Sequence, residues 1–436
     1  MWDYYNDKTL FITGGTGFLG TAVVYRLLTQ TSVSHVYMLC RGGIGKLQSK
    51  WTTSLSSATV EKLLSTNRVT VMDGDILSPD LGLSQNELNT LQQEVDVIIH
   101  SASSINLTKP LDRLSESIPG ASERMADIAL TCPNLDRFVY VSTAYANTFL
   151  PPTGEGIEVE IKEDIYDPNP NPNDHLDVMK EWTQVQETGT SDAYEAHDFP
   201  WPYAYAKNLT ERLLLHRFAQ SGVKDKLLIV RPSIIGSAQD FPSPGYIVPL
   251  SSPSTLIAAV IALIPGGTAT IATKAVEQSS QLFTDEVPVD VVVDRLLAHL
   301  AVGTNGCVHA VSGKQAWHPL IKWWEAAASL RRIPESVHLD WKDIDWKSDE
   351  QHPLAQFYVI FGSTFQFYED KTIALGRHPL VKTCKELQLF NQLDFADKLP
   401  SLMEDIYSVM NHIAESDERA RRVIKRYYQD SIKAKI

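Results

Sequence analysis

The sequence is poor in cysteine and in positive charge. Its cysteines match no metal-binding or redox spacing, so we expect reduced thiols in a reducing compartment and no metal site. Lysine and arginine number 39 against 53 acidic residues, and the formal net charge of −14 argues against a nucleic-acid partner. The four cysteines are Cys40, Cys132, Cys307 and Cys384.

Long apolar runs are also missing. None reaches the roughly 18 residues that a membrane-spanning helix needs. The nearest candidate, residues 256–265, predicts a buried core or pocket helix rather than membrane contact. The first seven residues are polar and lack the apolar core of a secretion signal. These absences predict a cytoplasmic protein and leave peripheral contact with a membrane open.

The sequence does contain a glycine-rich stretch, residues 13–20, which reads Thr-Gly-Gly-Thr-Gly-Phe-Leu-Gly. It lies between an apolar run at residues 10–12 and an amphipathic run, the context that a dinucleotide fingerprint requires. Gly15, Gly17 and Gly20 fit the spacing that permits a tight turn and a close approach to a pyrophosphate. The helix that follows would offer free amide groups to the phosphates. The cofactor-binding residues expected here are Gly14, Thr16, Gly17, Phe18, Leu19 and Gly20.

The next two predicted strands end in residues suited to the adenosine half of the cofactor. Residues 35–40 lead to Arg41, where an NAD-preferring site would carry an acid; a guanidinium suits a 2′-phosphate and indicates NADPH. Residues 69–72 lead to Asp75, an acceptor for the adenine amino group, and to Ile76 against the ring. A surface arginine and a turn aspartate are the alternatives.

Two further strands end in small or hydroxyl-bearing residues. Residues 95–100 precede small side chains that leave room for the cofactor, and we expect His100 to be a packed residue rather than a catalytic base. Residues 138–141 precede Thr143, whose hydroxyl would lie where open α/β sheets bind ligands. The small residues expected near the cofactor are Ser101, Ala102 and Ser103.

A tyrosine and a lysine open a helix that is predicted to run to about residue 220. Tyr203 and Lys207 are four residues apart and therefore share one helix face. A lysine beside a tyrosine hydroxyl favours the phenolate, which makes Tyr203 a candidate proton donor and acceptor. Tyr205 lies on another face and is the weaker candidate. Exposed helix neighbours are the alternative interpretation of this pair.

The rest of the sequence predicts an inserted segment and a sixth strand. Residues 151–202 are rich in proline and acids, with a helix predicted at 175–187, and form either a lid or a solvated surface excursion. A sixth strand, residues 227–230, leads to two residues expected to contact the cofactor, Pro232 and Ser233.

We therefore predict an α/β protein with a Rossmann-type doubly wound parallel sheet and a smaller, mostly helical domain. The dinucleotide-binding domain spans residues 1–250 with the insertion at 151–202 and a returning segment at about 281–312. Residues 251–280 and 313–436 form the substrate-binding domain.

Three motifs together resemble the extended short-chain dehydrogenase/reductases: residues 13–20, the Val-Ser-Thr-Ala-Tyr run at 141–145, and the Tyr203–Lys207 pair. The likeness is greatest to the fatty acyl-CoA reductase branch, also called the male-sterility type. That branch is supported by residues 100–103, by 231–234 followed by 242–246, and by 287–290. The resemblance runs through about the first three hundred residues.

The resemblance implies NADPH-dependent reduction of an acyl thioester, carried on coenzyme A or an acyl carrier protein, to an aldehyde or onward to a primary alcohol. By position, Thr143 would orient the carbonyl, Tyr203 would donate the proton and Lys207 would tune the tyrosine. Tyr203 and Lys207 are also expected to contact the cofactor, Lys207 through the ribose hydroxyls. Thioester-reductase domains of carboxylic acid reductases and peptide synthetases share this core.

Two other classes of function stay open. One is another reaction on the same scaffold, such as ketone or alcohol oxidoreduction or sugar-nucleotide epimerisation. The other is a non-enzymatic NADP-binding sensor or scaffold. The apolar, proline-punctuated residues 242–267 favour a lipid-like or aromatic acyl group over a sugar nucleotide, and the complete catalytic set argues against a sensor. The acyl chain, the carrier and the oligomeric state are left open.

Overall fold

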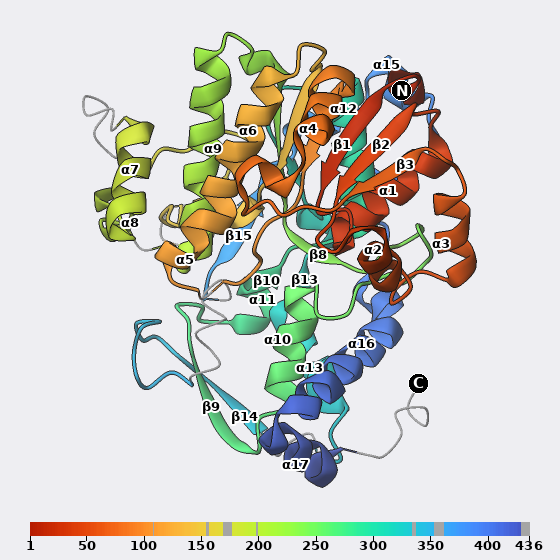
Figure 1. The fold of residues 1–436 in the computed structure, drawn as a ribbon. Helices are drawn as coiled ribbons and strands as arrows, with labels where there is room; N and C mark the ends of the chain where they lie inside the picture. Colours follow the sequence, from red (N-terminus) through yellow and green to blue (C-terminus); the bar gives the residue numbers. More distant parts are fainter. Residues whose placement is uncertain are drawn as a thin grey trace.

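A seven-stranded parallel sheet forms the centre of the protein (Figure 1). The computed structural model describes residues 1–107, 109–153, 157–168, 177–197, 199–333, 337–352 and 362–428. The strand order is β3-β2-β1-β4-β5-β7-β12, so the order reverses between β1 and β4. The strands are β1 (Thr9–Thr13), β2 (His35–Leu39), β3 (Val69–Met72), β4 (Val97–His100), β5 (Arg137–Val141), β7 (Leu227–Pro232) and β12 (Gly306–Ala310).

Helices cover both faces of this sheet. Along β1, Leu10 and Ile12 pack into the core beneath α1 and α12, whereas Phe11 packs into the core beneath α4, α6 and α9. Successive side chains of a strand point to opposite faces, so a strand buried on both faces reads as a continuous apolar run. The helices are α1 (Phe18–Gln30), α4 (Gln85–Glu94), α6 (Ala121–Thr131), α9 (Pro202–Gln220) and α12 (Val289–Ala301).

The inserted segment is anchored on the sheet domain through α7 (Val178–Thr188). Glu181 is buried and accepts hydrogen bonds from both terminal nitrogens of the Arg212 guanidinium, each at 2.6 Å. The Tyr205 hydroxyl donates to the same carboxylate at 2.5 Å. One face of this helix is therefore packed on the sheet domain, because a carboxylate enters the interior only with such partners. The interpretations of residues 151–202 as a lid or as a solvated surface excursion both stay predictions. Residues 169–176 of the predicted helix and loop lie outside the described residues.

The C-terminal part lies at the far end of the molecule, below the sheet in Figure 1. Four of its helices, α10, α13, α16 and α17, pack around a shared apolar cluster, as the predicted helical domain requires. The expectation of a mostly helical domain is confirmed, and strands accompany the helices, because β14 pairs with β9 and β15 pairs with β6. The elements are β9 (Gly267–Ala272), β14 (Val337–Lys342), β6 (Glu158–Ile161), β15 (Thr364–Phe367), α10 (Pro253–Ala262), α13 (Leu320–Ser329), α16 (Phe395–Ser416) and α17 (Glu418–Tyr427).

The remaining elements are short connections around these two parts. No helix in the part of the chain that the structure describes combines the length and the apolar character needed to cross a bilayer. Cys384 is half-buried, and the other three cysteines are buried free thiols. The short elements are α2 (Gly43–Trp51), α3 (Ser57–Leu64), α5 (Leu111–Ser115), α8 (Asp192–Glu195), α11 (Gln278–Gln281), α14 (Asp370–Leu375), α15 (Pro379–Lys382), β8 (Ile234–Gly236), β10 (Phe283–Thr284), β11 (Glu286–Pro288) and β13 (His318–Pro319).

Candidate active site

The glycine turn connects β1 to α1 at the point where the strand order reverses. Gly14 has φ +80°, a conformation that favours glycine, and its carbonyl accepts the Gly17 amide at 2.9 Å. Gly17 is the N-cap of α1, and no side chain caps the helix. The amide groups of the first turn, which starts at Phe18, are therefore available to an anion, and the positive end of the helix dipole favours one.

Close packing around the turn explains two of its glycines. A Cβ atom on Gly20 would lie 2.1 Å from the Gly14 carbonyl oxygen, and one on Gly14 would lie 2.7 Å from the Ala102 amide nitrogen. The Ser101 hydroxyl donates to the Thr13 carbonyl at 2.7 Å, so it braces β4 against β1. The cradle therefore fits a dinucleotide pyrophosphate, with the loop after β4 forming one side of it.

His100 is a packed residue, as predicted. Its Nδ1 lies 2.7 Å from the Thr13 hydroxyl and its Nε2 lies 3.2 Å from the Ser122 hydroxyl. Burial lowers the pKa of His100 to about 3, so the ring is neutral at physiological pH. A neutral imidazole with both nitrogens engaged holds the ends of β1 and β4 together.

Arg41 and Asp75 meet at the ends of β2 and β3. An Arg41 terminal nitrogen lies 3.6 Å from an Asp75 carboxylate oxygen, and the arginine side chain is 73% exposed. The second Asp75 oxygen accepts the Leu77 amide at 3.0 Å, and Ile76 is half-buried. The structure thus gathers the three residues predicted for the adenosine end, and the exposed guanidinium is accessible to a further anion.

The predicted catalytic residues gather at the carboxyl end of β5. Thr143 follows the strand, and its hydroxyl oxygen accepts the Tyr145 amide at 3.2 Å. From α9, the Lys207 ammonium donates to the Val141 carbonyl at 3.0 Å and lies 5.9 Å from the centre of the Tyr203 ring. This bond fixes the start of α9 against the strand that precedes Thr143. The catalytic roles of the three residues stay predictions.

Burial sets the protonation states of Lys207 and Tyr203. It lowers the pKa of Lys207 to about 7, although the Glu211 carboxylate acts in the opposite direction. It also raises the pKa of the Tyr203 hydroxyl. The expectation that Lys207 holds the tyrosine pKa down is therefore wrong for this structure, because the ammonium is directed at the Val141 carbonyl and desolvation of the phenol dominates. Tyr203 is thus a phenol at neutral pH, the form that donates a proton.

The lowered pKa of Lys207 predicts that the difference in stability between the parent protein and Lys207→Met depends on pH. Between about pH 7 and 10.5 the unfolded chain holds this proton and the folded chain does not, so the lysine's contribution to stability rises with pH. Lys207→Met, which removes the buried charge, is expected to be more stable than the parent at pH 6, with an advantage that shrinks towards pH 10. Urea unfolding of both proteins across this range measures the difference. A constant difference would contradict the shifted pKa.

Behind the site lies a buried ion pair that sequence reasoning missed. Arg231 donates to the two carboxylate oxygens of Glu211 at 2.9 and 2.5 Å, and neither side chain is exposed. The Ser142 hydroxyl donates to the same carboxylate at 2.5 Å. The available signal was the spacing, since Glu211 follows Lys207 by four residues and so shares its helix face. The pair joins α9 and β7 beside the strand end that carries Thr143.

Ser233 has a different partner from the one predicted. Its hydroxyl donates to an Asp285 oxygen at 2.5 Å, and Asp285 also accepts the Ser312 amide at 2.7 Å and the Trp317 indole at 3.1 Å. The hydroxyl is therefore used to hold the loops after β7 and β12 together. Contact of Pro232 and Ser233 with the cofactor stays a prediction.

A parallel sheet with this strand order and a glycine turn at its switch point define the chain as an extended short-chain dehydrogenase/reductase, a class of oxidoreductases with a dinucleotide-binding domain. The family model described as "Male sterility protein" matches residues 12–296. The chain belongs to this family.

Known proteins support this placement. Fatty acyl-CoA reductase 1 of Mus musculus is 30% identical over 303 residues, which cover 68% of this chain and 55% of the relative. Fatty acyl-CoA reductase 2 of Bos taurus is 26% identical over 322 residues, which cover 72% of this chain and 58% of the relative. The chain thus spans little more than half the length of these curated relatives.

Solved structures share the fold. The reductase domain of a nonribosomal peptide synthetase from Mycobacterium tuberculosis has a TM-score of 0.62 at 18% identity, covering 93% of this chain and 92% of that domain. UDP-glucuronic acid 4-epimerase from Bacillus cereus, in complex with NAD, has a TM-score of 0.54 at 14% identity. The match covers 92% of this chain and 97% of the epimerase. At these identities the likeness concerns the fold alone.

Proposed function

We propose that this chain reduces an acyl thioester to an aldehyde with NADPH. The observation that carries the proposal is the 3.0 Å bond from Lys207 to the Val141 carbonyl, which brings the lysine and Tyr203 to the strand end bearing Thr143. Relatives named fatty acyl-CoA reductases support the choice of an acyl thioester. The glycine cradle of the dinucleotide follows β1, which is separated from β5 by one strand, β4, and lies at the same edge of the sheet.

A dinucleotide held by the glycine cradle would supply a hydride to the thioester carbonyl carbon, and the chain's own residues would stabilise the charge that follows. Negative charge grows on the carbonyl oxygen, where the hydroxyls of Thr143 and Tyr203 donate; one such donor contributes about 3–4 kcal/mol. Tyr203 delivers the proton, and its raised pKa keeps that proton available. The bond from Lys207 to the Val141 carbonyl holds the start of α9 at this strand end and so positions the phenol. The resulting hemithioacetal expels the thiol and leaves the aldehyde, and a second hydride and proton would give the primary alcohol.

Product analysis tests the proposal. The protein is incubated with NADPH and acyl-CoA or acyl-pantetheine thioesters, and NADPH absorbance, free thiol and volatile products are followed together. We expect one thiol released per aldehyde formed. A protein that leaves all thioesters untouched but converts ketones or sugar nucleotides would overturn the proposal in favour of the alternative reactions. Comparing coenzyme A with a phosphopantetheinylated carrier protein identifies the carrier.

Arg41 is proposed to select NADPH. Arg41→Ala is expected to weaken NADPH binding by roughly 10- to 100-fold, the value of a hydrogen-bonded charge pair, with little effect on NADH. Fluorescence titration of both cofactors measures this. Arg113→Ala is the matched control, because that side chain is 78% exposed and its ion pair with Asp112 lies on α5. Equal losses for NADPH and NADH would show that Arg41 does not contact the 2′-phosphate.

A further inference from the structure

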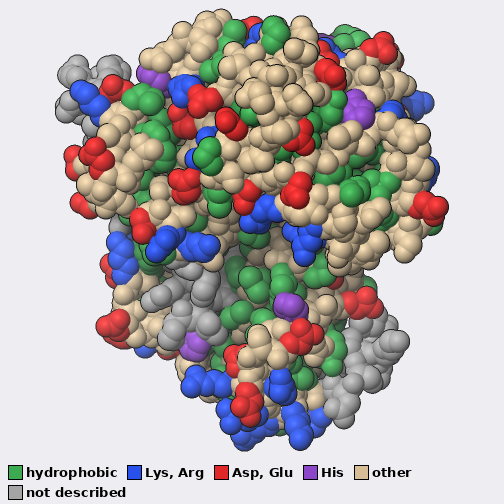
Figure 2. Space-filling model, viewed as in Figure 1, with side chains coloured by type: hydrophobic (Ala, Val, Ile, Leu, Met, Phe, Trp, Pro, Cys, Tyr) green, Lys and Arg blue, Asp and Glu red, His purple; other side chains and the backbone are tan. Residues whose placement is uncertain are grey.

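The helix α17, near the end of the chain, carries a concentration of positive charge. Its 10 residues include five basic side chains and one acid, Glu418, in a protein whose formal net charge is −14. Figure 2 shows Lys and Arg side chains gathered at the lower end of the molecule, where Figure 1 places α17. The charge of this end is therefore opposite in sign to that of the protein as a whole. The basic residues are Arg419, Arg421, Arg422, Lys425 and Arg426.

The basic side chains lie on one face of α17, and the helix packs through the other. Ala420 and Val423 are buried, and Val423 belongs to the apolar cluster shared with α10, α13 and α16. All five basic residues are exposed. Because a helix has 3.6 residues per turn, Arg421, Arg422 and Lys425 lie on the arc opposite Ala420 and Val423. The outward face of α17 is therefore basic apart from one acid.

In the part of the chain that the structure describes, four of the five basic side chains have no ionic partner. The fifth, Arg421, donates to the Ala414 carbonyl at 3.0 Å and so ties α17 to the end of α16. The Asp417 carboxylate, just before the helix, accepts the Arg419 amide at 2.7 Å and caps the helix. The charge of the four side chains is therefore available to an anion outside the molecule.

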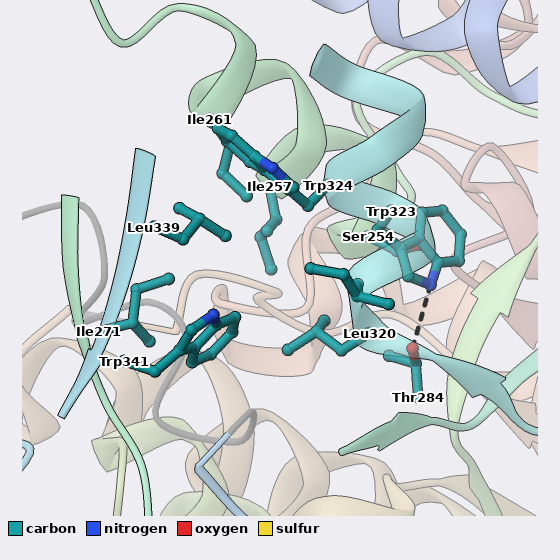
Figure 3. Close-up of a pocket in the computed structure, with 11 residues that line it drawn as sticks. Ser254, Ile257, Ile261, Ile271, Thr284, Leu320, Trp323, Trp324, Leu339 and Trp341 are labelled. Atoms are coloured by element: carbon teal, nitrogen blue, oxygen red, sulfur yellow. Dashed lines mark hydrogen bonds between the residues drawn. The ribbon is translucent and has the colours of Figure 1, made fainter. Parts of the chain in front are cut away.

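The elements beneath α17 are fixed by buried hydrogen bonds. The Trp323 indole on α13 donates to the Thr284 hydroxyl at 3.0 Å, the bond drawn dashed in Figure 3. Arg331, which follows α13, donates to the Ala262 carbonyl at the end of α10 at 2.9 Å. The Tyr428 hydroxyl, just beyond α17, donates to the same carbonyl. These bonds hold α17 in one orientation, so its basic face points to solvent before any partner arrives.

A turn beside α17 adds a further cation and an exposed apolar side chain. The Arg332 amide donates to the Tyr427 carbonyl at 2.7 Å, which places this turn against the end of the helix. Arg332 is exposed, and the following Ile333 is 59% exposed. Tyr427 is half-buried, and tyrosine is enriched at membrane–water interfaces. An exposed isoleucine among cations suits the boundary between headgroups and hydrocarbon.

We propose that α17, with Arg332 and Ile333, docks on an anionic phospholipid surface. The basic side chains face the headgroups, where each contributes about fivefold in affinity, and Ile333 enters the apolar boundary. This inference goes beyond the proposed function, since it concerns a surface rather than the dinucleotide crevice.

The position and the charge of this surface favour a membrane over two other anionic partners. A planar bilayer touches only the positive end, whereas a long nucleic acid would also meet the acidic remainder of the protein. A carrier protein that delivers a thioester would have to dock near Thr143, at the carboxyl end of β5. Figure 1 shows α17 at the far end of the C-terminal part, away from the sheet.

Vesicle sedimentation of the full chain tests the inference. Arg419→Gln, Arg422→Gln and Lys425→Gln are combined, because these side chains are exposed and glutamine has a helix propensity close to that of arginine and lysine. This triple variant is expected to bind vesicles of phosphatidylcholine and phosphatidylserine roughly 100-fold more weakly than the parent. Binding is measured without cofactor or thioester, so the result does not depend on the proposed function.

The matched control changes the net charge by the same amount elsewhere. It combines Lys62→Gln, Lys180→Gln and Lys224→Gln, three exposed lysines outside the C-terminal part, and it should bind like the parent. Raising the salt concentration from about 0.1 M to about 0.5 M should weaken binding of the parent at least about tenfold, because exposed charges are screened.

The apolar contribution has its own test. Ile333→Gln is expected to weaken vesicle binding by roughly tenfold, the value of burying one large aliphatic side chain. Unchanged binding would contradict the insertion of Ile333.

Three results would overturn the docking surface itself. They are no binding to anionic vesicles, equal binding to vesicles of phosphatidylcholine alone, and unchanged binding of the triple variant. A parent that ignores vesicles but binds duplex DNA or an acidic carrier protein through the same three side chains would reassign the surface and refute the membrane as its partner.

Discussion

Replacing Tyr203 with phenylalanine is expected to lower kcat by roughly 10²- to 10⁴-fold, the range for loss of a positioned proton donor. The substitution removes one oxygen and leaves the ring, which packs against the apolar cluster containing Tyr145 and Trp201. NADPH affinity should change little, because the glycine cradle at residues 14–20 lies between β1 and the start of α1, whereas Tyr203 lies on α9. Single-turnover kinetics and cofactor titration measure the two effects separately.

Tyr205→Phe is the matched control on the same helix. Its hydroxyl donates to Glu181 at 2.5 Å and lies 2.5 Å from the Ser191 hydroxyl, and the side chain is fully buried. Losing it should lower the melting temperature, because Glu181 loses a partner, while kcat at low temperature changes little. Near-normal turnover of Tyr203→Phe would remove that residue from the mechanism. A large loss of kcat in Tyr205→Phe would assign the donor role to the other tyrosine.

Local patterns predicted most of the sheet. Strands such as β1 and β5 are short apolar runs followed by turn residues, and both faces are buried, so their sequences show a strong signal. β12 was expected only as part of a returning segment, because Gly306 and His309 weaken its apolar run and its position beside β7 depends on tertiary pairing. β14 reads Val-His-Leu-Asp-Trp-Lys, an alternation typical of a strand, yet the surrounding helical pattern obscured it.

The candidate site was predictable where residue spacing within one helix, or position at the end of one strand, determines which side chains lie close together. Tyr203 and Lys207 share a face of α9 for that reason, and the sheet topology brings them to Thr143. The partner of Lys207 was not predictable, because the Val141 carbonyl lies 66 positions away in the chain and carries no side-chain signal. The direction of the change in the Tyr203 pKa was mispredicted for a related reason. Desolvation of the phenol depends on the side chains packed around it, and spacing along the sequence does not reveal them.

Glu211→Gln is expected to destabilise the fold by about 3–5 kcal/mol, because it leaves the Arg231 guanidinium buried without a countercharge. Both side chains are fully buried, and the arginine also lies 3.5 Å from Nε2 of the His309 ring. Burial lowers the pKa of His309 to about 3, so that ring is neutral and compensates no charge. The substitution also withdraws the carboxylate that raises the Lys207 pKa, so this pKa should fall below its present value of about 7.

Urea unfolding midpoints of Glu211→Gln and of an exposed control measure the loss. Glu325→Gln is that control, since its carboxylate lies 2.9 Å from the Lys322 ammonium with both side chains about half exposed. An exposed pair contributes about 0–1 kcal/mol, so the control should be nearly neutral. Replacing both members of the buried pair, in Glu211→Leu with Arg231→Met, should recover most of the stability, because no unpaired charge is then left inside. A double variant as unstable as Glu211→Gln would instead show that the ion pair acts through its geometry, by holding Ser142 and the strand end that precedes Thr143.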